Sequence, residues 1–205
     1  MRKIPTLFTR EYDEQGKIIR ITPELSRPDL ECVLRGEAIP TEKIDGACCA
    51  IINGVFYKRY DAKIGKNGKQ KVPPEGAVPC CAPDPITGHW PHWVRVDRVA
   101  AEDRWFVSAY ENAATREGAK GEIVRVYLAD GTYEAVGPHF RNNPYHLSED
   151  TLRKHGERVL RAPRDFYALR EYLWKSNIEG IVWWKDGQPI CKLKRTDFGF
   201  PWPDH

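Results

Sequence analysis

The sequence predicts an α+β fold made mainly of antiparallel strands. Three pairs of β-prone segments are each joined by an Asn-Gly or Asp-Gly dipeptide, only two segments have a helical pattern, and no repeat or heptad occurs. Sixteen glycines and sixteen prolines divide the chain into many short segments. With 205 residues, 41% hydrophobic and 30% charged, the chain has the composition of a globular protein, which excludes a collagen-like or mostly disordered chain. We therefore expect a single domain over residues 1–205.

The predicted hairpins follow from their turns. Asn53-Gly54 stands between the apolar segments 47–52 and 55–60 and suits a type I′ turn, in which both central residues have positive φ. Two further hairpins are expected: segments 123–128 and 132–136 around Asp130-Gly131, and segments 180–185 and 188–193 around Asp186-Gly187.

Two segments are expected to be helical. Segment 148–160 begins with a capping-type Ser148 followed by acidic residues. Segment 165–176 offers Asp165 as N-cap, and its apolar side chains recur at near-helical spacing. Between the first two hairpins, residues 64–93 are rich in Gly, Pro and Lys and predict a long loop that is functional or mobile.

Charge and cysteine content narrow the class of protein. Thirty-two Lys and Arg against 29 Asp and Glu give a net charge of +3, which leaves a nucleic-acid partner open without requiring one. No apolar run reaches the ~20 residues of a membrane span, and no apolar core follows the basic N-terminus, so neither a membrane segment nor a secretory signal is expected. Six cysteines without a CxxC pair predict free thiols in a reducing cytoplasm.

One loop holds several residues with metal-ligand or base-stacking chemistry. Cys80 and Cys81 with His89 and His92 suggest a zinc site, but adjacent cysteines seldom bind one ion, so we favour loop packing. The seven tryptophans, including the adjacent pair Trp183-Trp184, invite the same choice between RNA stacking and packing, and packing is favoured. Six basic residues lie between positions 58 and 71, and a solvated loop and a phosphate-binding flap explain them equally well.

The chemistry starts from the segment Thr41-Glu42-Lys43-Ile44-Asp45-Gly46. Lys-x-Asp-Gly alone is weak evidence, and by itself a surface loop with a turn residue explains it better. Charged residues of the expected hairpins follow it in a fixed order: Arg59, Glu134, Glu179, Lys192 and Lys194.

This ordered set resembles the covalent nucleotidyltransferases, which comprise polynucleotide ligases and RNA capping enzymes. It is most similar to the small ATP-dependent RNA ligases, including the 5′-to-3′ RNA ligase family also found in chordates, and the likeness covers most of the chain. The resemblance implies a nucleotidyltransferase (ATP-grasp-like) core of antiparallel sheets flanked by helices, with residues 1–37 as an N-terminal extension. Because only 11 residues follow Lys194, we expect no OB-fold domain.

The resemblance also implies a reaction. Lys43 attacks the α-phosphate of ATP and releases pyrophosphate, the AMP passes to an RNA 5′-phosphate, and a 3′-hydroxyl displaces AMP to seal the strand in RNA repair. The expected protein is a monomer. Two alternatives stay open: a DNA or nick-sealing ligase of the same superfamily, and an RNA-binding module that has lost catalysis.

A lysine nucleophile needs help from its surroundings. With a pKa near ~10.4, about one free lysine in a thousand is neutral at physiological pH, which costs roughly 4 kcal/mol. Lys192, Lys194, Arg59 and a bound Mg²⁺ or Mn²⁺ would supply a positive field that lowers the pKa of Lys43 and binds the triphosphate. By its family position Arg59 should contact the ribose or the incoming phosphate through its forked guanidinium.

The remaining roles are carried over by position. Glu134 should accept hydrogen bonds from ribose hydroxyls, and Glu179 should hold the metal ion, although each is otherwise an ordinary strand carboxylate. Asp45 should orient the lysine loop or simply form its turn. Phe140 is the expected adenine-stacking residue, with a core position as the alternative, and the backbone of Glu42 should read the adenine edge.

Overall fold

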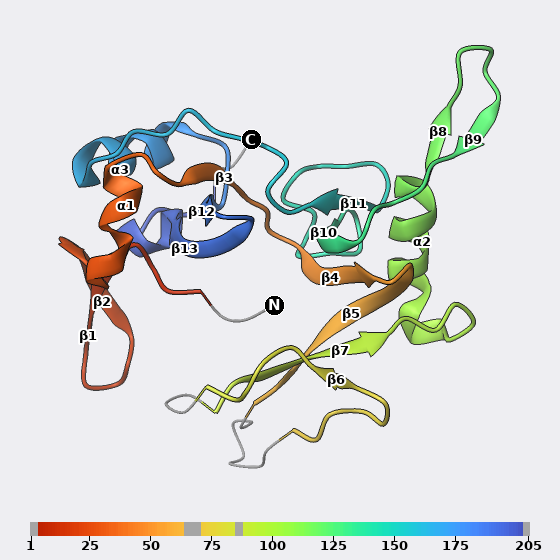
Figure 1. The fold of residues 1–205 in the computed structure, drawn as a ribbon, viewed down its shortest axis with the longest axis horizontal. Coiled ribbons are helices and arrows are strands. Elements are labelled where there is room, and N and C mark those ends of the chain that lie inside the picture. Colours follow the sequence, from red (N-terminus) through yellow and green to blue (C-terminus); the bar gives the residue numbers. More distant parts are fainter. Residues whose placement is uncertain (1–3, 64–70, 85–87, 203–205) are drawn as a thin grey trace. The chain divides into compact units, whose positions relative to one another are not determined.

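The computed structural model describes residues 4–63, 71–84 and 88–202. The described residues divide into two compact units: unit 1 lies within 45–154, and unit 2 combines residues 4–44 with residues 155–202. Antiparallel strand pairing dominates both units and helices are few, which confirms the α+β class (Figure 1). The assignment of one domain over residues 1–205 stays a prediction.

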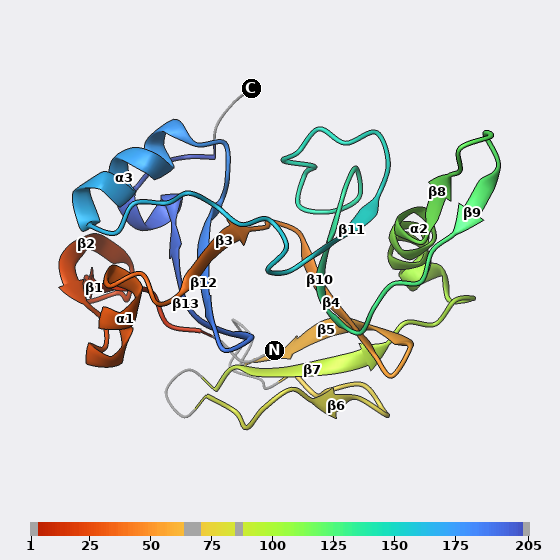
Figure 2. The same ribbon diagram turned by 45° about the horizontal axis from the view of Figure 1, so that its top comes forward.

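Unit 1 is built on a six-stranded sheet with the order β11-β10-β4-β5-β7-β6. Its strands are β4 (Ala47–Ile52), β5 (Val55–Ala62), β6 (Val78–Pro79), β7 (Trp90–Arg95), β10 (Gly131–Val136) and β11 (Thr151–Lys154). One face carries Cys49, Ile51, Phe56 and Tyr133, which are buried against helix α2 (Arg104–Ala113). The 3-10 turn η2 (Ala101–Asp103) precedes this helix, and the small hairpin of β8 (Thr115–Glu117) and β9 (Ile123–Arg125) follows it (Figure 2).

Unit 2 contains a three-stranded sheet with the order β13-β12-β3 and a separate N-terminal hairpin. The sheet strands are β3 (Ile39–Lys43), β12 (Gly180–Lys185) and β13 (Gln188–Lys194); the hairpin pairs β1 (Phe8–Tyr12) with β2 (Ile18–Leu25). Its helical elements are η1 (Pro28–Leu30), α1 (Glu31–Leu34), α3 (Phe166–Lys175) and η3 (Arg195–Phe198). Leu169 and Leu173 of α3 pack with Ile181 and Leu193 of the sheet to form the core of this unit.

Two of the three predicted hairpins are confirmed. Asn53 and Gly54 have φ values of 51° and 73°, and Asp186 and Gly187 have 50° and 72°, as type I′ turns require. They join β4 to β5 and β12 to β13.

The hairpin predicted around Asp130-Gly131 is wrong. β9 pairs with β8, whereas β10 pairs with β4 and β11. The Asp130 carboxylate instead accepts hydrogen bonds from the backbone N–H groups of Asn53 and Gly54, at 2.6 and 3.0 Å. Asp130 therefore caps a neighbouring turn rather than forming its own.

Of the two predicted helices, one is confirmed. Asp165 caps α3 by accepting from the backbone of Tyr167 and Ala168. The helix predicted over 148–160 is wrong, because residues 151–154 form β11 on the edge of the sheet and Asp150 is buried against His139. The predicted loop 64–93 contains β6 and the first residues of β7. Residues 64–70 and 85–87 of this loop lie outside the described residues.

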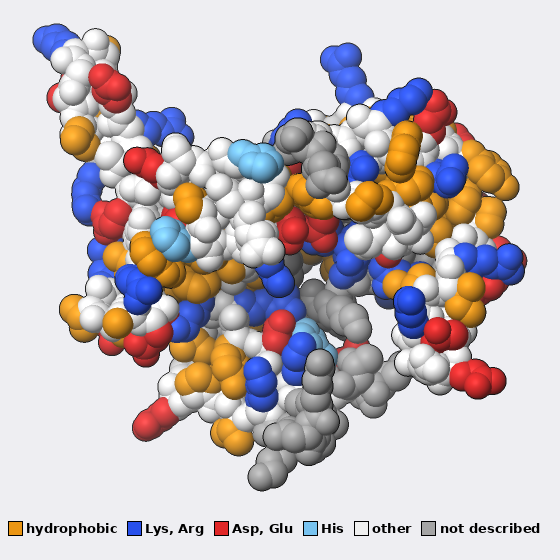
Figure 3. Space-filling model, turned by 180° about the vertical axis from the view of Figure 1, so that it is seen from behind, with side chains coloured by type: hydrophobic (Ala, Val, Ile, Leu, Met, Phe, Trp, Pro, Cys, Tyr) orange, Lys and Arg blue, Asp and Glu red, His pale blue; other side chains and the backbone are white. Residues whose placement is uncertain are grey.

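Charged side chains of both signs are interspersed on the face seen in Figure 3. All six cysteines are free thiols. Among the described residues, no helix is both long and apolar enough to cross a membrane.

Candidate active site

The register of the sheet in unit 2 places three predicted lysines on one face. Lys43 pairs with Gly180, and Gly180 pairs with Lys194, so the two lysines lie in one row across β3, β12 and β13. Lys192 lies two residues before Lys194, and side chains two residues apart in a strand share a face. The lysine face, as we name this surface, therefore presents Lys43, Lys192 and Lys194 together.

Lys43 is held by Glu179, the residue that precedes β12. Its Nζ lies 2.6 Å from a carboxylate oxygen of Glu179, and the two side chains are 23% and 15% exposed. A short ion pair in a half-buried setting fixes both side chains more firmly than a surface pair would. The structure thus brings together the predicted nucleophile and the predicted metal-binding carboxylate.

Gly180 keeps the row between Lys43 and Lys194 clear. A Cβ atom at this position would lie 2.3 Å from the backbone oxygen of Leu193 and 2.9 Å from the Cα of Lys194. Backbone atoms cannot move aside as a side chain can, so only glycine fits here.

The most perturbed base of the lysine face is Lys192. Burial, together with the positive charges of Lys43, Lys194 and Arg10, lowers the pKa of Lys192 to about 8, while Asp197 acts in the opposite direction. The cluster holds four cations, Lys43, Lys192, Lys194 and Arg10, against the two carboxylates of Glu179 and Asp197. Its chemistry therefore favours an anionic ligand with several charges.

Arg10 is a member of this cluster that the sequence did not reveal. Its guanidinium lies 2.5 Å from the Asp197 carboxylate, whose side chain is fully buried. The other Asp197 oxygen accepts the backbone N–H of Lys194 at 2.7 Å. The Nε of Arg10 is buried without a hydrogen-bond partner in the described part of the chain, so one donor of this arginine is unused. No motif marks Arg10, because it reaches the lysine face only through the folding of the β1–β2 hairpin.

Glu42 lies on the opposite face of the same sheet. It pairs with Ile181, which is fully buried in the core, and its carboxylate accepts from Arg158 at 2.6 Å. Its backbone N–H donates to the carbonyl of Arg158 at 3.0 Å. The adenine-reading role of the Glu42 backbone stays a prediction.

In unit 1, Glu134 and Arg59 share one face of the six-stranded sheet. Glu134 pairs directly with Cys48, and the β4–β5 register places Arg59 on the same face as Cys48. Burial and the negative charge of Glu134 raise the pKa of Cys48 to about 12, and Arg59 acts against this shift. The Cys48 thiol is therefore uncharged at neutral pH, and it lies between Glu134 and Arg59 on this face.

Arg59 is positioned by Asp61. Its Nε donates to the Asp61 carboxylate at 2.7 Å, and the Nε2 of His89 lies 3.3 Å from the same oxygen. Burial works against ionisation, yet Arg59 and His89 together lower the pKa of Asp61. The guanidinium thus has a fixed orientation on its strand.

Asp45 and Gly46 begin unit 1, and their backbone is tightly held. The N–H of Asp45 donates to the hydroxyl of Tyr145 at 2.8 Å, and the carbonyl of Gly46 accepts from Arg141 at 3.1 Å. A Cβ on Gly46 would lie 2.3 Å from the carbonyl oxygen of Ala135. The glycine of the Lys-x-Asp-Gly segment is therefore required by a close approach of two strands.

Phe140 occupies a core position. It is 6% exposed, belongs to the cluster beneath α2, and makes an edge contact with Phe106 at 5.2 Å between ring centroids. These facts agree with the core alternative. Its role as an adenine-stacking residue stays a prediction.

The structure also describes part of the loop 64–93 and the tryptophans, for which the sequence suggests packing, a zinc site or a phosphate-binding flap. Trp93 and Trp183 are buried, so packing accounts for them. His92 is buried with its Nδ1 2.9 Å from the Trp90 carbonyl, and the described residues contain no group of three or more His, Cys, Asp or Glu placed to hold a metal. Lys66 and Lys69 of the proposed phosphate-binding flap lie outside the described residues.

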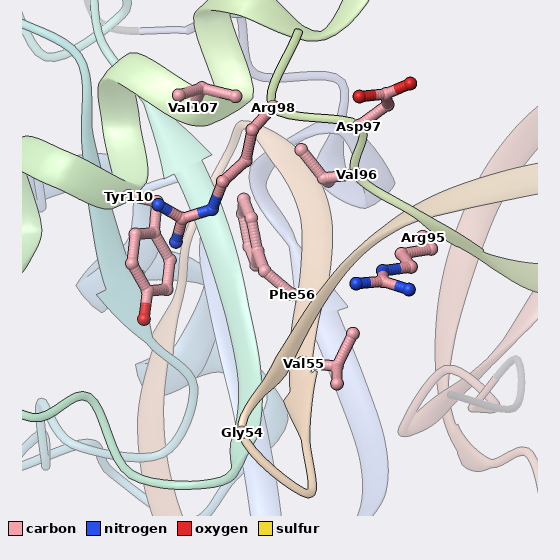
Figure 4. A pocket seen from close by; sticks show the side chains of 9 residues that line it. All are labelled: Gly54, Val55, Phe56, Arg95, Val96, Asp97, Arg98, Val107 and Tyr110. Carbon is pink, nitrogen blue, oxygen red and sulfur yellow. The ribbon is translucent and has the colours of Figure 1, made fainter.

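Unit 1 also has a cavity of about 590 Å³ beside α2 (Figure 4). Phe56 stands in it, with Tyr110 and Arg98 on one side and Arg95 on the other. Phe56 faces α2, and Arg59 lies three residues further along β5, so strand alternation puts Arg59 on the other face of the sheet. The cavity is therefore separate from the row of Glu134, Cys48 and Arg59.

The comparisons with known proteins agree with the predicted resemblance to RNA ligases. The chain is 27% identical to RNA ligase 1 of Pongo abelii, and 26% identical to RNA ligase 1 of Danio rerio and of Rattus norvegicus. Each similarity covers 98% of this chain and 82% of the relative. No model of a known protein family matches the chain. The chain is therefore similar along nearly its full length to the RNA ligase 1 proteins.

Proposed function

We propose that the protein is an ATP-dependent RNA ligase that joins 5′-phosphate and 3′-hydroxyl ends through a covalent lysyl-AMP on Lys43, in RNA repair. The observation that carries this proposal is the lysine face, where the amine of Lys43 forms a 2.6 Å ion pair with Glu179 and lies beside Lys192 and Lys194. The likeness to proteins named RNA ligase 1 supplies the substrate class.

In the first step the neutral amine of Lys43 attacks the α-phosphorus of ATP. A bond forms between Nζ and phosphorus, and the bond to the bridging oxygen breaks, so pyrophosphate leaves with the electron pair. Lys192, Lys194 and Arg10 stabilise the charge that develops on the phosphates. Because Lys43 pairs with Glu179 at rest, its amine must leave that carboxylate and lose its proton before it attacks.

The next two steps transfer and release AMP. An oxygen of the RNA 5′-phosphate attacks the lysyl-AMP phosphorus, and the bond to Lys43 breaks. The 3′-hydroxyl then attacks the activated 5′-phosphate, loses its proton and expels AMP, which leaves one new phosphodiester. The same cations serve all three steps, since each transfers a phosphoryl group.

The nucleoside is assigned to unit 1. Glu134 would accept hydrogen bonds from the ribose hydroxyls, and Arg59, fixed by Asp61, would contact the ribose or the incoming phosphate. The proposal includes a nucleotidyltransferase core over the whole chain, with residues 1–37 as an extension that contributes Arg10. Monomeric state and cytoplasmic location remain predictions.

A divalent cation fits the site only with Glu179 as its protein ligand. The described residues offer no cluster of three ligating side chains, but Mg²⁺ and Mn²⁺ often bind through one or two carboxylates, waters and substrate phosphates. When bound, the ion would supply positive charge at the carboxylate that now holds Lys43.

Incubation with α-labelled ATP and Mg²⁺, followed by denaturation, tests the proposal. Wild type should keep the label on the protein, and Lys43→Ala should lose it. Lys120→Ala, at an exposed lysine of unit 1, is the matched control and should label like wild type. Lack of label on wild type would favour the catalytically inactive RNA-binding module, and sealing of nicked DNA in preference to RNA would favour the DNA ligase.

A further inference from the structure

The N-terminal hairpin, α3 and η3 of unit 2 enclose a groove of about 380 Å³. Its walls come from β2 between Ile18 and Ile21, from the first turn of α3, and from the η3 segment between Thr196 and Gly199. We call it the η3 groove. None of the lysines of the proposed reaction lines it.

Apolar and aromatic side chains are exposed along this groove. Tyr167 is 71% exposed and Ile19 is 63% exposed, although both are large. The ring of Phe166 meets Tyr167 edge-on at 5.3 Å and holds it in place. A folded protein seldom presents such side chains together without a binding role.

The groove also carries a cation, Arg170, for which the described part of the chain offers no counter-ion. Arg170 lies three residues after Tyr167, on the same side of α3, and its guanidinium lies over the ring of Phe200 at 5.2 Å. It makes no ion pair or hydrogen bond with any other residue that the structure describes. Arg20 of the opposite wall differs, because Glu11 binds it through two contacts of 2.6 and 3.0 Å.

The aromatic surface continues past Arg170. Phe200 stacks near Phe198 at 5.8 Å and meets Trp174 edge-on at 4.9 Å, and Trp174 is largely exposed. An exposed arginine between aromatic rings is the pattern that binds single-stranded nucleic acid, since bases stack on the rings and phosphates bind the guanidinium.

The η3 groove is joined to the lysine face through Asp197. This residue lines the groove, and its carboxylate binds Arg10 and the backbone of Lys194. A strand lying in the groove would therefore approach the cluster that the proposed reaction uses for phosphates.

We propose that the η3 groove binds unstacked nucleotides of the RNA substrate, with a base stacked on Tyr167 and a backbone phosphate on Arg170. The inference rests on the proposed function for the identity of the ligand. It assigns the strand to a surface that lies outside the motifs of the catalytic cluster.

Binding of a short fluorescent RNA with a 5′-phosphate and a blocked 3′ end tests the groove. Tyr167→Ala and Arg170→Glu should each weaken binding roughly tenfold, and Arg170→Glu should also lower the salt dependence by about one released counter-ion. Arg116→Glu makes the same charge change at an exposed residue of β8 and should bind RNA nearly as wild type does. All three variants should form lysyl-AMP without RNA at the wild-type rate.

The outcomes separate this inference from the proposed function. Lysyl-AMP formation with unchanged RNA affinity in both groove variants would overturn the inference and leave the ligase intact. Loss of RNA affinity in the groove variants of a protein that never forms lysyl-AMP would support the groove and overturn the ligase. If the groove variants bind RNA normally but change the oligomeric state in sedimentation, the groove is a protein interface and the inference fails.

Discussion

The charged faces of the two units are compensated differently. On the lysine face of unit 2, four cations stand against the carboxylates of Glu179 and Asp197. On the unit 1 sheet face that carries Glu134, Arg59 has Asp61 in direct contact, and Arg153 lies directly opposite Glu134 in the strand register. The first surface has four cations for two carboxylates, whereas Arg59 and Arg153 of the second each have a carboxylate beside or opposite them.

From this difference we expect the two faces to bind different parts of the substrate in the proposed reaction. Excess positive charge suits a polyphosphate, whose own charges complete the cluster. A balanced face with fixed donors and acceptors suits a neutral ribose or base, where hydrogen-bond geometry decides the binding. Variants that change charge in one unit should therefore affect phosphate chemistry, and variants in the other should affect nucleoside affinity.

The largest expected effect comes from removing a cation of the lysine face. Lys192→Met keeps the length of the side chain and should slow lysyl-AMP formation by about 10²–10³-fold, because a preoriented charge on the phosphates is lost. Single-turnover labelling with ATP measures the rate. Lys120→Met is the control, and an equal rate in both variants would contradict the role of the cluster.

A pair of isosteric changes sharpens the contrast between the two carboxylates. Glu179→Gln should lower the rate of sealing about a hundredfold and change its dependence on Mg²⁺, since it removes the charge that holds Lys43. Glu134→Gln should mainly raise KM for ATP, by about tenfold, with a smaller effect on the maximal rate. Titrations of ATP and Mg²⁺ for each variant measure both effects. If the two variants depend on ATP and Mg²⁺ in the same way, the proposed assignment of phosphate chemistry to unit 2 and nucleoside binding to unit 1 is wrong.

Whether an element of the fold could be predicted depends on how far apart in the sequence the interacting residues lie. The turns at Asn53-Gly54 and Asp186-Gly187 and the N-cap Asp165 were predictable, because two or three neighbouring residues decide them. The turn at Asp130 failed because its carboxylate bonds to residues more than seventy positions away. Sequence reasoning also missed α2, although its apolar side chains recur at helical spacing: Trp105, Phe106, Ala109, Tyr110 and Ala113.

The candidate site shows the same limit. The order of Lys43, Glu179, Lys192 and Lys194 was readable from family resemblance, and the β3–β12–β13 register then brings them together. Arg10 was not readable, because its place depends on how the N-terminal hairpin folds against η3. The depressed pKa of Lys192 likewise follows from burial and neighbours that no local pattern specifies.

Glycine substitutions test whether close backbone approach is equally strict in both units. Gly46→Ala and Gly180→Ala should each lower the free energy of unfolding by roughly 1–3 kcal/mol, because each added Cβ would meet a backbone oxygen at 2.3 Å. Gly118→Ala meets only the flexible side chain of Glu122 and should have little effect. Urea unfolding measures all three, and wild-type stability of Gly180→Ala would show that the row between the lysines can widen.

The smallest effect expected is on stability, and it has the opposite sign to the effect on activity. Since folding lowers the pKa of Lys192 to about 8, the folded protein carries a penalty for its charge at neutral pH. Lys192→Met should therefore raise the free energy of unfolding near neutral pH, by about 1–2 kcal/mol after allowance for solvent screening.

The pH dependence of that gain gives the sharper test. Between pH about 8 and the ordinary lysine value of 10.5, the unfolded chain binds the proton more tightly, so wild type gains stability as pH rises and the advantage of Lys192→Met shrinks. Added pyrophosphate should stabilise wild type more than the variant, because its charge completes the cluster. A constant advantage across this pH range would contradict the lowered pKa of Lys192, and equal stabilisation by pyrophosphate would contradict phosphate binding by this lysine.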